Sequence, residues 1–134
     1  MIEDAAHCCG SQYFSKKRNK WVVSGEKTLA QCFSFYCNKC ITTAGEGGMV
    51  VTNSEELADK VRMLYLHGLS STAWSRFKKG GKTLYDIITP GYKYNLTDVA
   101  AAMGIEQLKR NNFLRIKRQQ MVEYYQKKLQ KIPL

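Results

Sequence analysis

Hydrophobic and polar positions alternate over short stretches in the first half of the chain. Residues 29–36 (LAQCFSFY) alternate with the period of two that is typical of a strand, and GMVVT at 48–52 is a second, β-branched strand after a glycine turn. The opening residues, MIEDAAH, look like the end of a strand that runs into a loop at Asp4. Residues 10–28 are polar and marked by glycine, and this pattern predicts a loop.

Helical periodicity dominates the second half of the chain. Ser54 can cap a helix with two glutamates in its first turn. Its apolar positions fall on one face, which we expect to pack on the sheet: Leu57, Val61, Leu64 and Tyr65. Thr97 or Asn95 can cap a second helix, DVAAAMGIEQLKR. Residues 68–91 lie between these helices, are rich in glycine, serine and lysine, and predict a long irregular excursion.

A last helix is predicted from about residue 113 to residue 131. An apolar stripe along it indicates a core face or a contact between subunits rather than a cofactor contact; its members are Leu114, Met121, Tyr125, Leu129 and Ile132. Strands early and helices late indicate the α/β class, in a chain whose 134 residues are enough for one domain. The amount of predicted sheet is too small for an independent doubly wound fold.

Composition and charge narrow the class of protein. Hydrophobic residues make up 44% of the chain and charged residues 24%, which is typical of a globular protein. The formal net charge of +10 favours polyanionic ligands such as phosphorylated small molecules. We expect neither nucleic acid nor a membrane as a partner, because no nucleic-acid module and no apolar run of roughly 20 residues occurs. The start of the chain lacks a signal-peptide pattern, so the predicted location is cytoplasmic.

The five cysteines leave three readings open. Cys37 and Cys40 have the Cys-x-x-Cys spacing of a zinc or redox motif, and Cys8 or Cys9 could complete a zinc site. Adjacent cysteines converge poorly on one metal, and the residues after Cys40 are a poor helix start for a redox pair. We therefore expect thiols that behave as small, partly buried hydrophobes, and no metal site.

One lysine stands where α/β proteins bind ligands. Asp4 ends the first strand, Ser34 lies on the next strand, and Lys39 follows just beyond that strand's end. Ligands in α/β sheets gather beyond the strand ends. A lysine amine can form a Schiff base with a carbonyl, an aspartate can pair with a protonated pyridine nitrogen, and a hydroxyl can bind a phosphate oxygen. These residue types are therefore compatible with pyridoxal phosphate, although their spacing alone does not establish it.

A series of longer motifs runs through the chain: EDAAH, FSFYCNK followed by TTAGEGGMVVT, LYLHG, and GYKYNLTDVAAAMGIEQLKR. In order and spacing they resemble the pyridoxal-phosphate-dependent nucleotide-sugar aminotransferases of the DegT/StrS type, from about residue 2 to about residue 130. The resemblance implies a fold-type-I, aspartate-aminotransferase-like large domain. A related class is a sugar dehydratase built on the same scaffold, in which a histidine replaces the lysine. Lys39 argues against that activity for this chain.

The resemblance also implies roles for five residues. Lys39 matches the family lysine that forms a Schiff base with pyridoxal phosphate and shuttles a proton. Asp4 matches the acid that pairs with the pyridinium nitrogen, and His7 the position near the ring hydroxyl. Ser34 matches a phosphate-binding hydroxyl, and Asn95 an asparagine that reaches the cofactor phosphate of a neighbouring subunit. The alternatives are a loop or helix cap, a strand hydroxyl or a surface side chain.

The implied reaction transfers an amino group from an amino acid, commonly glutamate, to a nucleotide-linked keto-sugar. Family members are longer, so residues 1–134 are expected to be the second half of the large domain, without its N-terminal part and without the small C-terminal domain. We therefore expect weak or no activity unless a homodimer or a complementing chain completes the site. The alternatives are a non-catalytic interaction module derived from the enzyme, and a small cysteine-ligated zinc protein.

Overall fold

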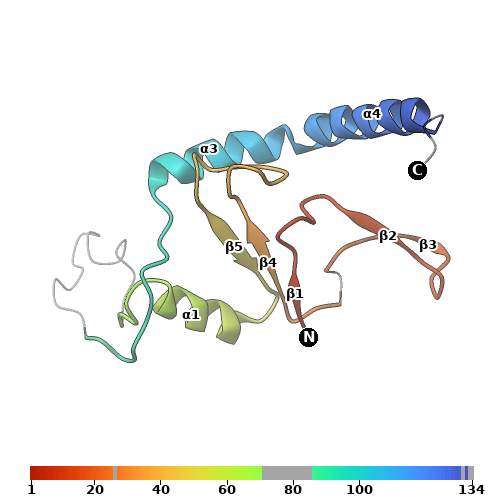
Figure 1. Cartoon of the computed structure of the whole chain (residues 1–134). Coiled ribbons are helices and arrows are strands. Elements are labelled where there is room, and N and C mark those ends of the chain that lie inside the picture. Colours follow the sequence, from red (N-terminus) through yellow and green to blue (C-terminus); the bar gives the residue numbers. More distant parts are fainter. Residues whose placement is uncertain (26, 71–85, 131, 133–134) are drawn as a thin grey trace.

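The computed structural model of the chain describes residues 1–25, 27–70, 86–130 and 132 (Figure 1). Strands come first and helices follow, as the sequence predicts. In chain order the elements are β1 (Ile2–Asp4), β2 (Gln12–Ser15), β3 (Lys20–Val23), β4 (Ala30–Ser34), β5 (Gly48–Val51), α1 (Glu55–Leu64), α3 (Asp98–Lys109) and α4 (Asn111–Leu129).

A small mixed sheet carries the predicted strands in the order β1-β4-β5. β4 lies in the middle, parallel to β1 and antiparallel to β5. The register pairs Asp4 with Cys32 across β1 and β4. The strands predicted at the chain start, at 29–36 and at 48–52 are therefore confirmed. Because parallel strands end at the same edge of a sheet, the loops that follow β1 and β4 leave from one side.

The loop predicted for residues 10–28 is wrong in part, because it contains the antiparallel hairpin β2–β3. The register pairs Tyr13 with Val22 and Phe14 with Trp21, and the Phe14 and Trp21 rings meet edge to face at 5.8 Å. Such aromatic and β-branched cross-strand pairs stabilise a hairpin. Each run is only four residues long, and charged residues separate the two runs, so the alternation is hard to recognise in the sequence.

The helix caps follow the sequence closely. The Ser54 hydroxyl accepts from the backbone N–H of Leu57 at 3.2 Å, and the predicted apolar face of α1 is half-buried, with α1 in contact with β5. Thr97, not Asn95, caps α3, since its hydroxyl accepts from the N–H of Ala100 at 3.3 Å. The last helix begins at Asn111 and ends at Leu129, close to the predicted range.

The excursion predicted at 68–91 falls partly on residues 71–85, which lie outside the described residues. Its two flanks are held together by backbone hydrogen bonds. Ser70 donates to the Asp86 carbonyl at 2.9 Å, and Ile88 donates to the Gly68 carbonyl at 2.9 Å.

The buried core is small, and most of it lies around β1, β4 and the loop between β4 and β5. Among the described residues it consists of Ala5, Val22, Ala30, Phe35, Ile41, Thr43 and Leu69. In Figure 1, α3 lies beside that loop and α4 extends away from the sheet. Each helix in the described part of the chain is too short or too polar to cross a lipid bilayer.

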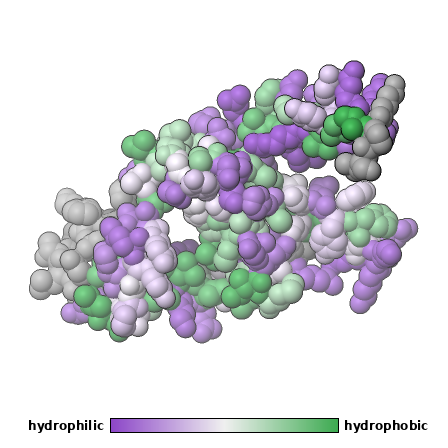
Figure 2. Space-filling view, in the orientation of Figure 1, coloured by the Kyte–Doolittle hydropathy of each residue, from purple (hydrophilic) through white to green (hydrophobic). Residues whose placement is uncertain are grey.

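The apolar stripe of the last helix is not a core face in this chain. Leu114 is half-buried, but the other members are 55–58% exposed: Met121, Tyr125, Leu129 and Ile132. Figure 2 shows hydrophobic side chains at the visible surface, over α4 among other elements. In the described part of the chain, α4 contacts α3 but no strand of the sheet, and Figure 1 shows it extending beyond the sheet. A contact between subunits stays a prediction.

Candidate functional site

The candidate site lies where the parallel strands β1 and β4 end. Asp4 is the last residue of β1, and Ser34 is the last residue of β4. The register pairs Asp4 with Cys32, so Ser34 stands two positions beyond that pair along the same direction. The segments that follow these strands, 5–10 and 35–47, therefore begin at the same edge of the sheet.

Lys39 and His7 meet between these two segments. Lys39 Nζ lies 2.8 Å from His7 Nε2, a hydrogen-bond distance between residues 32 positions apart. Lys39 is half-buried and His7 is exposed. A lysine amine donates hydrogen bonds and an imidazole nitrogen without a proton accepts them. The contact therefore joins the Lys39 amine to a hydrogen-bonding partner on segment 5–10.

The segment that carries Lys39 is held by a network of backbone hydrogen bonds. We call residues 35–47 the lysine loop. Phe35 donates to the Gly47 carbonyl at 2.7 Å, Cys37 donates to the Gly45 carbonyl at 3.1 Å, and Lys39 donates to the Tyr36 carbonyl at 3.0 Å. These bonds extend the β4–β5 pairing past the strand ends and close the loop on itself, so that the base of the Lys39 side chain has a defined position.

Thr43 fixes the far side of the lysine loop. Its side chain is 1% exposed, and its hydroxyl donates to the Glu46 carbonyl at 3.0 Å. Gly47 is required beside it, because a Cβ at Gly47 would lie 2.1 Å from Thr43 Oγ1. On the other side, a Cβ at Gly104 of α3 would lie 2.8 Å from Thr43 Cγ2. Close packing of α3 on the lysine loop therefore depends on these two glycines.

Asp4 and Ser34 each bind one backbone N–H of their own segment. Asp4 Oδ1 accepts from Ala6 N at 3.0 Å, and Ser34 Oγ accepts from Tyr36 N at 3.3 Å. Asp4 is exposed and Ser34 is half-buried. A carboxylate has further lone pairs, and a hydroxyl that accepts one bond can still donate one. Both side chains therefore keep hydrogen-bonding capacity at the sheet edge.

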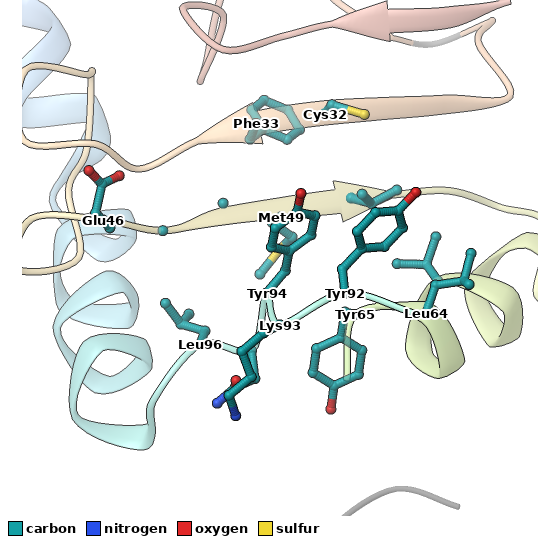
Figure 3. A pocket seen from close by; sticks show the side chains of 15 residues that line it. Cys32, Phe33, Glu46, Met49, Leu64, Tyr65, Tyr92, Lys93, Tyr94 and Leu96 are labelled. Carbon is teal, nitrogen blue, oxygen red and sulfur yellow. The ribbon is translucent and has the colours of Figure 1, made fainter. Parts of the chain in front are cut away.

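Asn95 lies elsewhere, in a groove of about 950 Å³ formed by β4, β5, α1 and the segment before α3. Figure 3 shows the Tyr92 and Tyr94 rings side by side in this groove, and their centroids are 5.0 Å apart with the ring planes 4° from parallel. In the described part of the chain, no hydrogen bond joins Asn95 to Lys39. The assignment of Asn95 to the cofactor phosphate of a neighbouring subunit stays a prediction.

The cysteines give the zinc alternative no ligand set. All five are free, and within the described ranges no three His, Cys, Asp or Glu side chains are placed to hold a metal ion. Cys37 is exposed, whereas Cys40 is half-buried and its Sγ donates to the His7 carbonyl at 3.6 Å. Cys40 therefore belongs to the contact between the two segments of the site.

Two curated proteins, among those similar in sequence, match nearly the whole chain. The chain is 45% identical over 132 residues to the uncharacterized protein MJ1066 of Methanocaldococcus jannaschii, and 44% identical over 133 residues to the spore coat polysaccharide biosynthesis protein SpsC of Bacillus subtilis. These matches cover 98% and 99% of the chain but 32% of each relative. The chain thus spans about a third of the length of the relatives that it matches.

In the structural comparison, too, the chain matches about a third of the length of each neighbour. The chain superimposes with a TM-score of 0.76 on a putative sugar aminotransferase, Spr1654 from Streptococcus pneumoniae in its PMP-form, at 34% identity, covering 96% of the chain and 32% of that protein. The TM-score is also 0.76 for Helicobacter pylori PseC, an aminotransferase involved in the biosynthesis of pseudoaminic acid, at 29% identity, covering 98% and 32%. These neighbours confirm the predicted fold class, part of a fold-type-I pyridoxal-phosphate-dependent transferase.

The motifs quoted from the sequence, the sheet edge that carries Lys39 and the relatives agree on one assignment. The sequence profile of the DegT/DnrJ/EryC1/StrS aminotransferase family matches residues 1–134, and the chain belongs to that family.

Proposed function

We propose that this chain is the lysine-bearing part of a pyridoxal-phosphate-dependent sugar aminotransferase, with Lys39 as the catalytic residue. The observation that carries the proposal is the 2.8 Å contact between Lys39 Nζ and His7 Nε2 at the edge where β1 and β4 end. It supports the proposal because it places an amine and a hydrogen-bonding partner where α/β folds bind ligands.

The side chains at this edge suit the chemistry of the cofactor. Pyridoxal phosphate, when bound, supplies an aldehyde that condenses with a lysine amine and a pyridine ring that takes up electrons. The Asp4 carboxylate would pair with the protonated ring nitrogen, and the Ser34 hydroxyl would donate to the phosphate. His7 would lie near the ring hydroxyl. An amine, a carboxylate, a hydroxyl and an imidazole are among the groups that this ligand uses.

The residues of the chain have distinct tasks in this proposal. Lys39 must lose its ammonium proton to act as a nucleophile, and it then takes up and returns a proton at the substrate carbon. His7 accepts a hydrogen bond from Lys39 Nζ and so holds the amine in one place. The closed lysine loop, fixed by buried Thr43, limits movement of the amine during both tasks.

The substrates and partners are proposed on the same basis. A nucleotide-linked keto-sugar would receive the amino group and an amino acid such as glutamate would donate it, and the formal charge of +10 suits a diphosphate group. Names of relatives that refer to polysaccharide and pseudoaminic acid biosynthesis support a sugar substrate. A homodimer or a complementing chain would complete the site through Asn95. The cytoplasmic location stays a prediction.

The competing function is a non-catalytic interaction module derived from the enzyme. The observation that favours it is the exposure of apolar side chains on α4, where Met121 is 58% exposed and Leu129 is 55% exposed. Such a module would keep the fold and the dimer surface without a working cofactor site. The two proposals differ in whether Lys39 selectively binds an aldehyde.

The test is covalent labelling. We expect that adding pyridoxal phosphate and reducing with borohydride modifies Lys39 selectively, as mapped by peptide mass spectrometry. Lys39→Ala should lose this label, whereas Lys60→Ala, which removes an exposed lysine of α1, should keep it. Diffuse labelling over many lysines would contradict the cofactor site and favour the interaction module.

A further inference from the structure

Two of the five cysteines lie between the same two segments as Lys39 and His7. Cys40 follows Lys39 in the lysine loop, and its Sγ donates to the His7 carbonyl at 3.6 Å. Cys9 stands two residues after His7 and lines an apolar cavity of about 330 Å³ together with Phe35 and other lysine-loop residues. Both thiols are half-buried at the junction of segment 5–10 with the lysine loop.

The other three cysteines do not share this environment. Cys32 and Cys37 are exposed. Cys8 is half-buried, but unlike Cys9 it does not line the cavity beside Ile41, the residue that follows Cys40. Cys9 thus faces the lysine loop next to Cys40, while Cys40 Sγ reaches segment 5–10 at the His7 carbonyl, and this reciprocal approach associates the two thiols. Long-range placement, not sequence spacing, defines the pair.

We propose that Cys9 and Cys40 form a redox-responsive dithiol, which a peroxide-class oxidant converts into an intramolecular disulfide that links segment 5–10 to the lysine loop. The Cys40 thiolate attacks the peroxide, forms a sulfenic acid and releases hydroxide. The Cys9 thiol then displaces water from that sulfenic acid and forms the S–S bond. Together the two thiols lose two protons and two electrons, the released hydroxide takes up one of the protons, and one hydrogen peroxide is reduced to two waters.

The electrostatics of the pair set the order of these steps. Burial raises the pKa of the Cys9 thiol, and negative charge on Cys40 nearby raises it further. A thiol with a raised pKa is a poor first nucleophile. Cys40 is therefore the site of peroxide attack, and Cys9 is the resolving thiol.

Oxidation would act on Lys39 through its neighbour. The disulfide removes the S–H group that Cys40 donates to the His7 carbonyl, and it ties the residue next to Lys39 to segment 5–10. The contact between Lys39 Nζ and His7 Nε2 depends on how these two segments lie. This consequence for catalysis rests on the proposed function of Lys39, whereas the disulfide itself does not.

The first experiment maps the disulfide. The full chain is treated with hydrogen peroxide, free thiols are blocked with N-ethylmaleimide, and non-reduced peptides are analysed by mass spectrometry. We expect a cross-linked peptide that joins Cys9 to Cys40, both in the wild type and in a variant with Cys8→Ser, Cys32→Ser and Cys37→Ser together. A Cys37–Cys40 or Cys8–Cys40 bond, or Cys9 and Cys40 both still blocked by the maleimide, would overturn the proposal.

The second experiment tests the coupling to Lys39 without the cofactor. Acetic anhydride modifies accessible amines, and we expect the modification of Lys39 to change severalfold after oxidation, to recover with dithiothreitol, and to stay constant in Cys9→Ser. Unchanged Lys39 reactivity in a chain that carries the disulfide would overturn the coupling. Because neither readout uses pyridoxal phosphate, both remain informative if the borohydride label at Lys39 fails.

Discussion

At the scale of single residues, His7 determines how Lys39 is presented. Lys39 has a flexible side chain, and the bond to His7 Nε2 at 2.8 Å selects one of its conformations. A neutral hydrogen bond contributes about 0.5–1.5 kcal/mol. We therefore expect His7→Leu to lower the ratio of Lys39 labelling to labelling of other lysines about 2- to 10-fold in the pyridoxal phosphate and borohydride assay.

The control for this prediction keeps a hydrogen-bonding group at the same place. His7→Gln retains a side-chain acceptor for Lys39 Nζ and should lose less selectivity than His7→Leu. Circular dichroism of both variants checks that the fold is unchanged. Equal labelling selectivity in the wild type and in His7→Leu would show that the lysine loop alone positions the amine.

A second prediction concerns Cys9 and the pH dependence of the stability of the folded chain. Its pKa is raised in the folded chain by burial first and by Cys40 second. Above the ordinary thiol pKa of about 8.5, the unfolded chain loses the Cys9 proton while the folded chain keeps it. The folded state then binds more protons, so the stability contributed by the neutral thiol is complete below that pH and is lost as pH rises through the folded pKa.

The raised pKa of Cys9 predicts that the pH dependence of stability differs between the wild type and Cys9→Ser. On going from pH 8 to pH 10, the unfolding free energy of the wild type should fall more steeply than that of Cys9→Ser, measured by urea unfolding under reducing conditions. Serine has no ionisation in this range, and all other titrating groups are shared. Parallel pH profiles would show that Cys9 ionises alike in the folded and unfolded chains.

The site residues differ in how far the sequence predicts them. Asp4, Ser34 and Lys39 follow recognisable strand ends, so their position at one sheet edge follows from the parallel pairing alone. The Lys39–His7 bond does not follow from sequence, because its partners are 32 positions apart. Thr43 was also not predicted, since its role depends on a helix that begins 55 residues later, at Asp98.

At the scale of elements, α3 and the lysine loop meet through Gly104 and Thr43. Alanine in place of a helical glycine usually stabilises by about 1 kcal/mol. Here the new methyl group would lie 2.8 Å from Thr43 Cγ2, inside the usual contact distance of about 3.5–4.0 Å. We therefore expect the stability change from Gly104→Ala to be more favourable in a Thr43→Ser background, by about 0.5–3 kcal/mol.

A double-mutant cycle measures this coupling by urea unfolding of the wild type, both single variants and the double variant. Thr43→Ser is suited to the cycle because it removes Cγ2 and keeps the hydroxyl that donates to the Glu46 carbonyl. Ala102→Gly, at an exposed position of the same helix, measures helix propensity and should cost the same in both backgrounds. Additive changes at Gly104 and Thr43 would mean that the helix shifts away from the loop without cost.

The elements themselves were predictable where one physical signal dominated. The α1 cap at Ser54 and the β4 alternation are local signals, and both are present in the structure. The β2–β3 hairpin was missed because Lys16, Lys17, Arg18 and Asn19 form its turn without the Asn-Gly or Asp-Gly pair that marks short hairpins. Its stability depends on cross-strand pairing, which the two short runs do not reveal separately.

At the scale of the whole molecule, the chain exposes more surface than a compact protein of its size. Its accessible surface is 10952 Å² at a mass of 15.3 kDa, whereas a compact monomer of that mass exposes roughly 7,100 Å². The accessible surface of the chain is thus about half as large again as that of a compact monomer. The difference is larger than the roughly 1,200–2,000 Å² that a standard protein–protein interface buries. Exposed apolar side chains within this surface, Met121 and Leu129 of α4 among them, favour association.

We therefore expect the purified chain to self-associate, with α4 as part of the contact. Met121 and Leu129 are exposed apolar residues of this helix, and replacing both by glutamine removes apolar surface while keeping a good helix former. Met121→Gln with Leu129→Gln should lower the weight-average mass in sedimentation velocity, in a concentration-dependent way. Lys127→Gln changes an exposed polar residue of the same helix and is the matched control.

The sedimentation result distinguishes a chain that associates through α4 from a chain that stays monomeric. Association that the α4 double variant weakens and the control does not would mean that this helix is an interaction surface, and a second copy or a complementing chain could then supply Asn95 to the Lys39 site. A wild type that stays monomeric over the micromolar range would mean that the exposed stripe does not drive self-association. In that case a site that needs Asn95 from a second copy could not form, and selective labelling of Lys39 would have to arise within one chain, from the segments that β1 and β4 bring together.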